Sequence, residues 1–335
     1  MAYTTIKKPS DYFNTKLYTG NGSEDHTISG VGFQSDLTWL KSRSSAISHM
    51  WTDAVRGNNN VINSNTSDAE TTFSSLKSWN SDGFVLSNNS NFNGSGVTFA
   101  SWNWKANGAG SANTDGSINT TATSVNTTSG FSISKYTGTG ANATFGHGLG
   151  VIPDIVFWKR TDNSAGGVNW IVQSPILGNQ TKLVLNTSDA TSTGSSFSQT
   201  DNWTSSLIDL KTYEGENSSG GTYIAYAFAE KTGYSKFGSY TGNGNSDGPF
   251  IYTGFKPAFV MTKKTSGTSS WDIHDTKRDT YNVASKYLLA EDSGAEGNTA
   301  ILDILSNGFK FRSSNGDRNA SGGTYIYMAF AEAPL

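Results

Sequence analysis

The sequence contains no cysteine among its 335 residues. No disulfide can therefore brace the fold and no thiolate can bind a metal, while the compartment stays open because disulfide-free proteins also work outside cells. No apolar run approaches the roughly 18 residues that a membrane-spanning helix needs. The stretch from Met1 to Lys8 also lacks the apolar segment of a signal peptide. We expect no membrane insertion, synthesis in the cytoplasm, and release by cell lysis if the protein acts outside.

Charge is scarce as well. Only 15% of the residues are charged, the net charge is −3, and the densest basic points are the pairs Lys159-Arg160 and Lys263-Lys264. A groove that follows a phosphate backbone needs clustered Lys and Arg, so nucleic acid is not an expected partner. Aromatic residues make up 12% and can build a core, and 37 glycines favour short strands joined by turns.

Two phrases divide the chain into repeats. The phrase Tyr-Thr-Gly-x-Gly begins at Tyr18, Tyr136 and Tyr240. The phrase Gly-Gly-Thr-Tyr-Ile, closely followed by Ala-Phe-Ala-Glu, begins at Gly220 and Gly322, with a weaker counterpart at Gly94. The chain is therefore three copies of a unit of about 100 residues, which is the usual size of a domain.

The pattern within each copy predicts strands. Residues 222–229 and 325–330 are apolar on both faces, as in strands covered on both sides, and no window keeps helical periodicity. We predict an all-β protein of three tandem antiparallel β-sandwich domains of jelly-roll or lectin-like type. The predicted parts are copy 1 (residues 1–105), a Gly/Ser/Thr/Asn-rich linker (106–128), copy 2 (129–231) and copy 3 (232–335). The linker composition predicts that copy 1 is separate and that copies 2 and 3 form a coupled pair.

An Asp-x-x-Arg pair, Asp53 with Arg56, recurs as Asp275 with Arg278, but the aligned positions of copy 2 hold Ser174 and Leu177. Arg forks bind carboxylates and similar groups with two parallel hydrogen bonds, so Arg56 and Arg278 are candidate ligand-binding residues. The alternative is an ion pair that braces a loop, and we favour it because a feature of several repeats usually serves the fold.

Four tryptophans in polar surroundings are candidate platforms for stacking on sugar rings, although such residues more often cap a core. They are Trp51, Trp79, Trp203 and Trp271.

The sequence predicts no catalytic residues, metal site or cofactor. The histidines fall at unrelated positions in the copies, and no spacing singles out a pair among the 27 acidic residues. Asn315, Asp317 and Asn319 alternate like calcium ligands, but the bidentate Glu of such a loop is absent, so a turn is favoured.

The chain resembles a family of structural proteins from marine bacteriophages. The likeness extends over nearly the whole chain and is carried by four segments: Ser10–Gly20, Trp102–Ala106, Gly238–Gly244 and Ser321–Glu332. The resemblance implies a component of the virion, tail-fibre-like or lectin-like, and brings no catalytic residues with it.

We therefore expect a non-enzymatic virion protein on the particle exterior, at the tail or capsid. A tail-fibre or adhesin module that contacts host surface glycans is the favoured interpretation. The alternatives are a decorating (cement) protein that stabilises the particle and, less favoured, a glycan-cleaving enzyme, which would need a pocket with paired carboxylates. Expected partners are other virion proteins, further copies in a homo-oligomer, and a host glycan.

Overall fold

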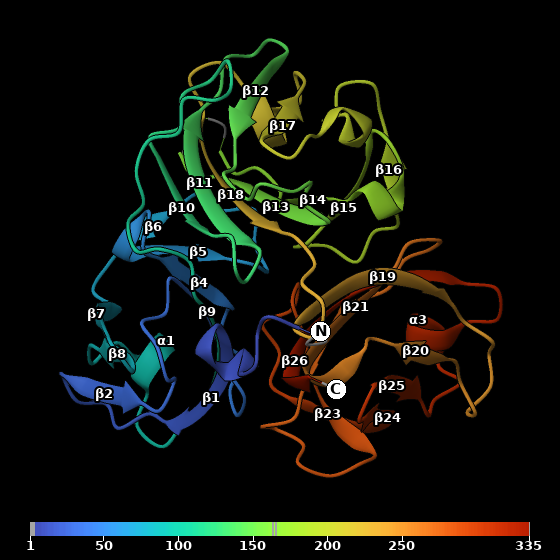
Figure 1. Cartoon of the computed structure of the whole chain (residues 1–335). Helices are drawn as coiled ribbons and strands as arrows, with labels where there is room; N and C mark the ends of the chain where they lie inside the picture. Colours follow the sequence, from blue (N-terminus) through green and yellow to red (C-terminus); the bar gives the residue numbers. More distant parts are fainter. Residues whose placement is uncertain (1–3, 163, 165, 335) are drawn as a thin grey trace.

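The computed structural model describes residues 4–162, 164 and 166–334, and these residues form an all-β protein of antiparallel sheets. Three lobes surround a common centre (Figure 1), and each lobe corresponds to one sequence copy. This confirms the predicted all-β sandwich class, whereas the lectin-like type and the division into three domains stay predictions. None of the described helices has the length and apolar character needed to cross a membrane.

Each lobe is built from the strands of one copy, and in the described residues one four-residue α-helix precedes its last strand. Copy 1 contains β1 (Phe13–Thr19), β2 (His26–Ser29), β3 (Leu37–Ser42), β4 (Met50–Asp53), β5 (Gly57–Asn63), β6 (Thr71–Thr72), β7 (Leu76–Asn80), β8 (Gly83–Leu86), α1 (Ser90–Asn93) and β9 (Thr98–Trp104). Copy 2, together with the end of the preceding segment, contains β10 (Ala122–Asn126), β11 (Phe131–Thr137), β12 (Ala143–Gly146), β13 (Ile155–Arg160), β14 (Ile171–Gln173), β15 (Thr181–Val184), β16 (Ser192–Thr193), β17 (Leu207–Leu210), α2 (Glu214–Asn217) and β18 (Thr222–Phe228). Copy 3 contains β19 (Ser235–Thr241), β20 (Phe250–Tyr252), β21 (Phe255–Lys264), β22 (Trp271–Asp275), β23 (Ala284–Leu289), β24 (Gly297–Leu305), β25 (Gly308–Phe311), α3 (Gly316–Asn319) and β26 (Thr324–Pro334). Short 3₁₀ turns occupy Pro9–Asp11, Pro175–Leu177 and Thr200–Asn202.

The main sheets share the order of their central strands, while copy 2 adds β10 at one end and copy 3 adds β25 and β20 at the other. In the described residues these orders are β1-β9-β3-β4-β5-β6, β10-β11-β18-β13-β14-β15-β16 and β19-β26-β21-β22-β23-β24-β25-β20. In each sheet the opening strand of the copy pairs with its closing strand, which then pairs with the strongly apolar third strand. The closing strand is thus central, as its apolar character on both faces predicts.

The recurring phrases form one local structure that closes each lobe. The tyrosine hydroxyl of each opening phrase donates to a helix carbonyl: Tyr18 to Phe92 (2.7 Å), Tyr136 to Glu216 (2.6 Å) and Tyr240 to Arg318 (2.9 Å). The last helical residue is a buried asparagine in every copy: Asn93, Asn217 and Asn319. Its side chain accepts the N–H of the residue after the first glycine of the phrase and donates to nearby carbonyls. A side chain on that glycine is excluded, because a Cβ at Gly138 would collide with the carbonyl oxygen of Ser218.

One apolar core lies where the three lobes meet, and strands of every copy contribute to it. Trp104, Phe228 and Phe330 occupy equivalent positions of β9, β18 and β26, and their rings touch one another at centroid distances of 5.6–6.1 Å. Each lobe also has a smaller core of its own. Burial of apolar surface in a shared core couples the three copies energetically.

The segment 106–128 is not a loose linker in the structure. Its last part forms β10, which extends the sheet of copy 2, and Ile118 is buried in the core of that lobe. At its start, the carboxylate of Asp36 accepts the N–H groups of Ala106 (2.7 Å) and Gly108 (3.2 Å). The expectation that copy 1 is separate from the other two is therefore wrong, because backbone pairing and the shared core override the linker-like composition.

Candidate functional site

Three of the four candidate tryptophan platforms are buried and cannot stack on a sugar at the surface. Trp51 and Trp271 lie in the central core, and Trp203 lies in the core of copy 2. Their indole faces pack on other aromatic rings, such as Trp51 on Tyr226. Trp79 is only partly buried, with its Nε1 donating to Thr38 Oγ1 at 3.3 Å. The prediction is thus corrected for Trp51, Trp203 and Trp271, which fill cores as aromatic side chains of this size usually do. Trp79 packs against the core of copy 1 and stays a candidate.

Both Asp-x-x-Arg pairs are buried ion pairs at junctions between copies. Arg56 Nε donates to Asp53 Oδ2 at 2.5 Å, and both side chains are fully buried. The other oxygen of Asp53 accepts the backbone N–H of Arg56 at 2.9 Å, which closes the loop. The hydroxyl of Tyr226, from copy 2, donates to Asp53 Oδ2 at 2.7 Å. The pair therefore braces its loop and also joins copy 1 to copy 2.

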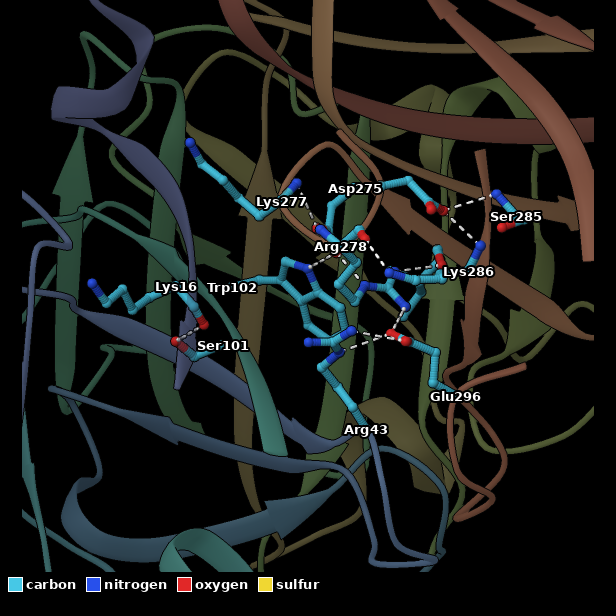
Figure 2. Close-up of polar contacts among 12 residues, drawn as sticks. Lys16, Arg43, Ser101, Trp102, Asp275, Lys277, Arg278, Ser285, Lys286 and Glu296 are labelled. Atoms are coloured by element: carbon cyan, nitrogen blue, oxygen red, sulfur yellow. Dashed lines mark hydrogen bonds and ion pairs between the residues drawn. The ribbon is translucent and has the colours of Figure 1, made fainter. Parts of the chain in front are cut away.

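The second pair repeats this arrangement between copies 3 and 1. Figure 2 shows Arg278 Nε donating to Asp275 Oδ2 (2.5 Å) and Trp102, from copy 1, donating its Nε1 to the same oxygen (3.1 Å). Glu296 lies at the outer end of the cluster, where it accepts two bonds from Arg43 at 2.9 Å each and lies 3.4 Å from Arg278. Because no face of Arg56 or Arg278 is open to a ligand, the ligand-clamp interpretation is wrong for the folded chain.

The third junction, between copies 2 and 3, has neither the buried aspartate nor the side chain that donates a hydrogen bond to it. Ser174 stands at the Asp position, and its hydroxyl donates to the carbonyl of Asp154 at 2.5 Å. The position equivalent to Trp102 and Tyr226 is Met328, which is buried in the central core. A buried indole or hydroxyl without an acceptor costs free energy, so the donor and the acceptor must be kept or lost as a pair.

A buried lysine joins the copies at all three junctions. The third strand of each copy ends near such a lysine: Lys41, Lys159 and Lys263. Each ammonium donates to a carbonyl of a neighbouring copy: Lys41 to Ser293 (3.0 Å), Lys159 to Ser67 (2.9 Å) and Lys263 to Ser188 (3.1 Å). Burial lowers the pKa of each lysine to about 8. The sequence shows these lysines after an apolar strand, but only the ring of copies reveals their role.

Other titratable groups with displaced pKa values are also enclosed. Burial raises the pKa of Glu216 to about 8, and the Oε2 atom of Glu216 accepts the N–H of Ser198 at 2.9 Å. Burial likewise raises the pKa of Asp272 to about 7, although the guanidinium of Arg318 at 2.6 Å opposes the shift. Perturbed carboxyl groups can mark an active site, but these two are fully enclosed, although Oε1 of Glu216 has no hydrogen-bond partner among the described residues. In the described part of the chain no three His, Asp or Glu side chains gather as a metal-binding group.

The alternating residues near 315–319 form a helix end. Asn315 caps α3 by accepting the N–H of Asp317 at 2.7 Å, and the amide of Asn319 donates to three oxygen acceptors. These contacts agree with the turn that the sequence favoured over a calcium loop.

The protein thus belongs to the all-β class, and several of its buried polar groups join neighbouring copies. Over residues 8–334 the chain matches a family described as a domain of unknown function, DUF7483, and it belongs to that family. A search of curated proteins found no match.

Proposed function

We propose that this chain is a structural protein on the exterior of a bacteriophage particle, where it acts by contact rather than by catalysis. The phage assignment rests on the sequence resemblance of the repeated phrases. The proposal that the protein is not a catalyst is supported by the contacts of its buried charged groups. Asp53, Asp275 and the three junction lysines all form hydrogen bonds with a neighbouring copy. These buried charged groups therefore hold the lobes together rather than face a substrate.

Docking onto the particle is the contact that the geometry supports best. The three lobes form one body with a shared core, which suits a rigid element that decorates or reinforces a larger surface. Trp51, Trp203 and Trp271 are buried, so they cannot provide the aromatic surfaces on which the predicted glycan-binding role depended.

Attachment to a host glycan is the second candidate, and a different set of aromatics favours it. Tyr281 is 85% exposed on the loop before β23, and Phe250 and Tyr252 project from β20 with 44% and 55% exposure. Exposed aromatic faces can stack on sugar rings, and several weak sites on an oligomeric particle would add through avidity.

Imaging of purified particles tests the proposal. A phage carrying a C-terminal epitope tag on this chain is labelled with gold-conjugated antibody, and untagged particles serve as the control. We expect gold at regular positions on the intact exterior. Absence of the chain from purified particles, with recovery in the soluble lysate, would refute the structural role.

The non-catalytic part has its own measurement. The purified protein is incubated with polysaccharide from the host envelope, and released oligosaccharides are measured over time. We expect no release. Steady release that disappears with one Asp or Glu substitution would show an enzyme. Binding of a tagged protein to the same polysaccharide, lost in Tyr281→Ala but not in Trp79→Ala, would favour attachment over docking.

A further inference from the structure

The three main sheets differ at the edge next to the opening strand, although the copies are otherwise alike. In copy 2, the strand β10 pairs antiparallel with β11, from Ala122 opposite Lys135 to Asn126 opposite Phe131. The residues that form β10 come from the segment between copies 1 and 2. The opening strands of the other copies, β1 and β19, stand at the end of their sheets in the described residues. In copy 2 the edge of the opening strand is therefore covered by a further strand. The equivalent edges of copies 1 and 3 have no such strand in the described residues.

The free edge of β1 presents unused backbone groups. Lys105 N–H donates to the carbonyl of Tyr12, and Gly20 N–H donates to the carbonyl of Val97, which fixes the phase of the ladder between β1 and β9. Because bonds in an antiparallel pair alternate, the odd-numbered residues of β1 direct their N–H and C=O groups away from β9. Leu17 is one of these residues. Such an edge is a template for an added strand.

A hollow of about 300 Å³ lies along this edge. It is lined by Asn14, Thr15, Lys16, Leu17, Gly30 and Lys277. Thr15 is only 5% exposed, and its hydroxyl is shielded from solvent and has no hydrogen-bond partner among the described residues. The equivalent residues of the other copies, Ile133 and Phe237, carry no polar group. An unpaired buried hydroxyl costs free energy, so this position is less favourable in copy 1 than in the other two copies.

The hollow corresponds to the place that β10 fills in copy 2. There, Val125 of β10 lies against the loop that follows β12, so closely that a Cβ on Gly148 would come within 3.2 Å of it. Gly30, which lines the hollow in copy 1, lies in the equivalent loop after β2. A strand placed on β1 as β10 is placed on β11 would therefore occupy this space.

The charges near β1 indicate which side chain an added strand would need. Figure 2 shows Lys16 and Lys277 extending to the same side of Trp102. Lys16 interacts electrostatically with Asp82 of its own copy, but in the described residues neither ammonium forms a direct ion pair with a carboxylate. Position 123 of β10 lies opposite Ser134, whose counterpart in copy 1 is Lys16. An acidic residue at the equivalent position of an added strand would face Lys16.

We propose that the β1 edge binds an extended segment of a partner protein, rich in small and β-branched residues and carrying an acidic side chain. The segment pairs antiparallel with β1, and its carboxylate faces Lys16. This inference rests on the proposed function, since the partner is a neighbouring protein of the particle. The edge-binding experiment is independent of the imaging experiment, so failure of one leaves the other to be judged separately.

The probes are synthetic peptides with the sequence of residues 119–127, which contains the natural β10. One peptide has the native sequence, one carries Thr123→Asp, and one carries Thr123→Lys. Hydrogen–deuterium exchange of the whole protein, followed by mass spectrometry, reports protection of residues 12–20. We expect the Asp peptide to protect this segment at sub-millimolar concentration and to bind about fivefold more tightly than the native peptide, as one partly exposed ion pair allows. The Lys peptide binds least.

Two protein variants make the test specific. Leu17→Pro removes one N–H that faces the free edge and leaves the ladder with β9 intact, because proline is tolerated at such edge positions. Ser239→Pro is the matched control at the equivalent position of β19. We expect Leu17→Pro to abolish protection and Ser239→Pro to keep it. Lys16→Glu should reverse the order of the Asp and Lys peptides.

Three results would overturn the proposal. One is no protection of residues 12–20 by any peptide at millimolar concentration. Another is an order of peptide affinities that Lys16→Glu leaves unchanged. The third is a dimer of the protein alone that Leu17→Pro dissolves, since the occupant would then be a second copy of this chain.

Discussion

Replacement of Asp275 by serine, the residue that copy 2 holds at this position, should destabilise the protein strongly. The carboxylate is fully buried and accepts bonds from Arg278 (2.5 Å), from Trp102 of copy 1 (3.1 Å) and from the backbone N–H of Arg278 (2.8 Å). Without it the guanidinium stays buried, and its nearest carboxylate is that of Glu296 at 3.4 Å. Breaking a buried pair by removing one partner costs about 3–5 kcal/mol.

A second substitution should restore much of this loss. Asp275→Ser together with Arg278→Leu copies the chemistry of Ser174 and Leu177 and leaves no charge at these two positions, while Glu296 keeps Arg43 as its partner. The indole N–H of Trp102 still lacks its acceptor, which costs about 1–3 kcal/mol. We therefore expect the double variant to be more stable than the Asp275→Ser variant, although it contains one more substitution.

Urea unfolding followed by tryptophan fluorescence measures both variants and Arg278→Leu alone, which completes a double-mutant cycle. The expected coupling between the two positions is on the order of 2–3 kcal/mol. A loss below about 1 kcal/mol for Asp275→Ser, or a double variant less stable than both single variants, would refute the role of the pair as a buried junction.

Two further predictions concern buried polar groups. Because the folded-state pKa of Glu216 is raised to about 8, its contribution to stability is fully present below the unfolded pKa near 4.5 and is lost as the pH rises through 8. Glu216→Gln should remove up to about 1.4 kcal/mol per pH unit of that slope, and urea unfolding at pH 5, 6.5 and 8 should show a flatter profile; equal profiles for both proteins would contradict it. Asn217→Ala should lower the free energy of unfolding by about 2–4 kcal/mol, since the N–H of Thr139 and the carbonyl of Lys211 lose buried partners. Exposed Asn202→Ala is the control, and similar unfolding midpoints for the two variants would show that the asparagine does not close the lobe.

The sequence predicts much of the fold because local chemistry repeats in it. The Tyr-Thr-Gly-x-Gly phrase recurs because the tyrosine and the close-packed glycine make the same contacts with a helix in each lobe. The central place of the closing strands follows from their apolar character on both faces. The path of residues 106–128 could not be predicted in this way, because Ala, Ser and Thr are equally suited to a linker and to an edge strand. The segment forms a strand because the edge of β11 offers backbone groups for it to pair with.

The candidate site was predicted less well, and for a physical reason. A tryptophan in a polar stretch of sequence can face solvent or a core built by distant segments, and Trp51 meets Trp170 and Tyr226 from another copy. The Asp-x-x-Arg pair is visible in the sequence, but its third partner is 173 residues away in each case. The simultaneous change to Ser174 and Met328 in the third junction is a signal that a comparison of the copies, position by position, could have found.

The account depends above all on the claim that the three copies form one body with a shared core. Differential scanning calorimetry of the whole chain tests this claim most directly, because the ratio of the van't Hoff enthalpy to the calorimetric enthalpy reports the size of the cooperative unit. We predict a single transition with a ratio near one. Two or more resolved transitions, with copy 1 unfolding apart from copies 2 and 3, would contradict the shared core and restore the separate domains that the linker composition suggested.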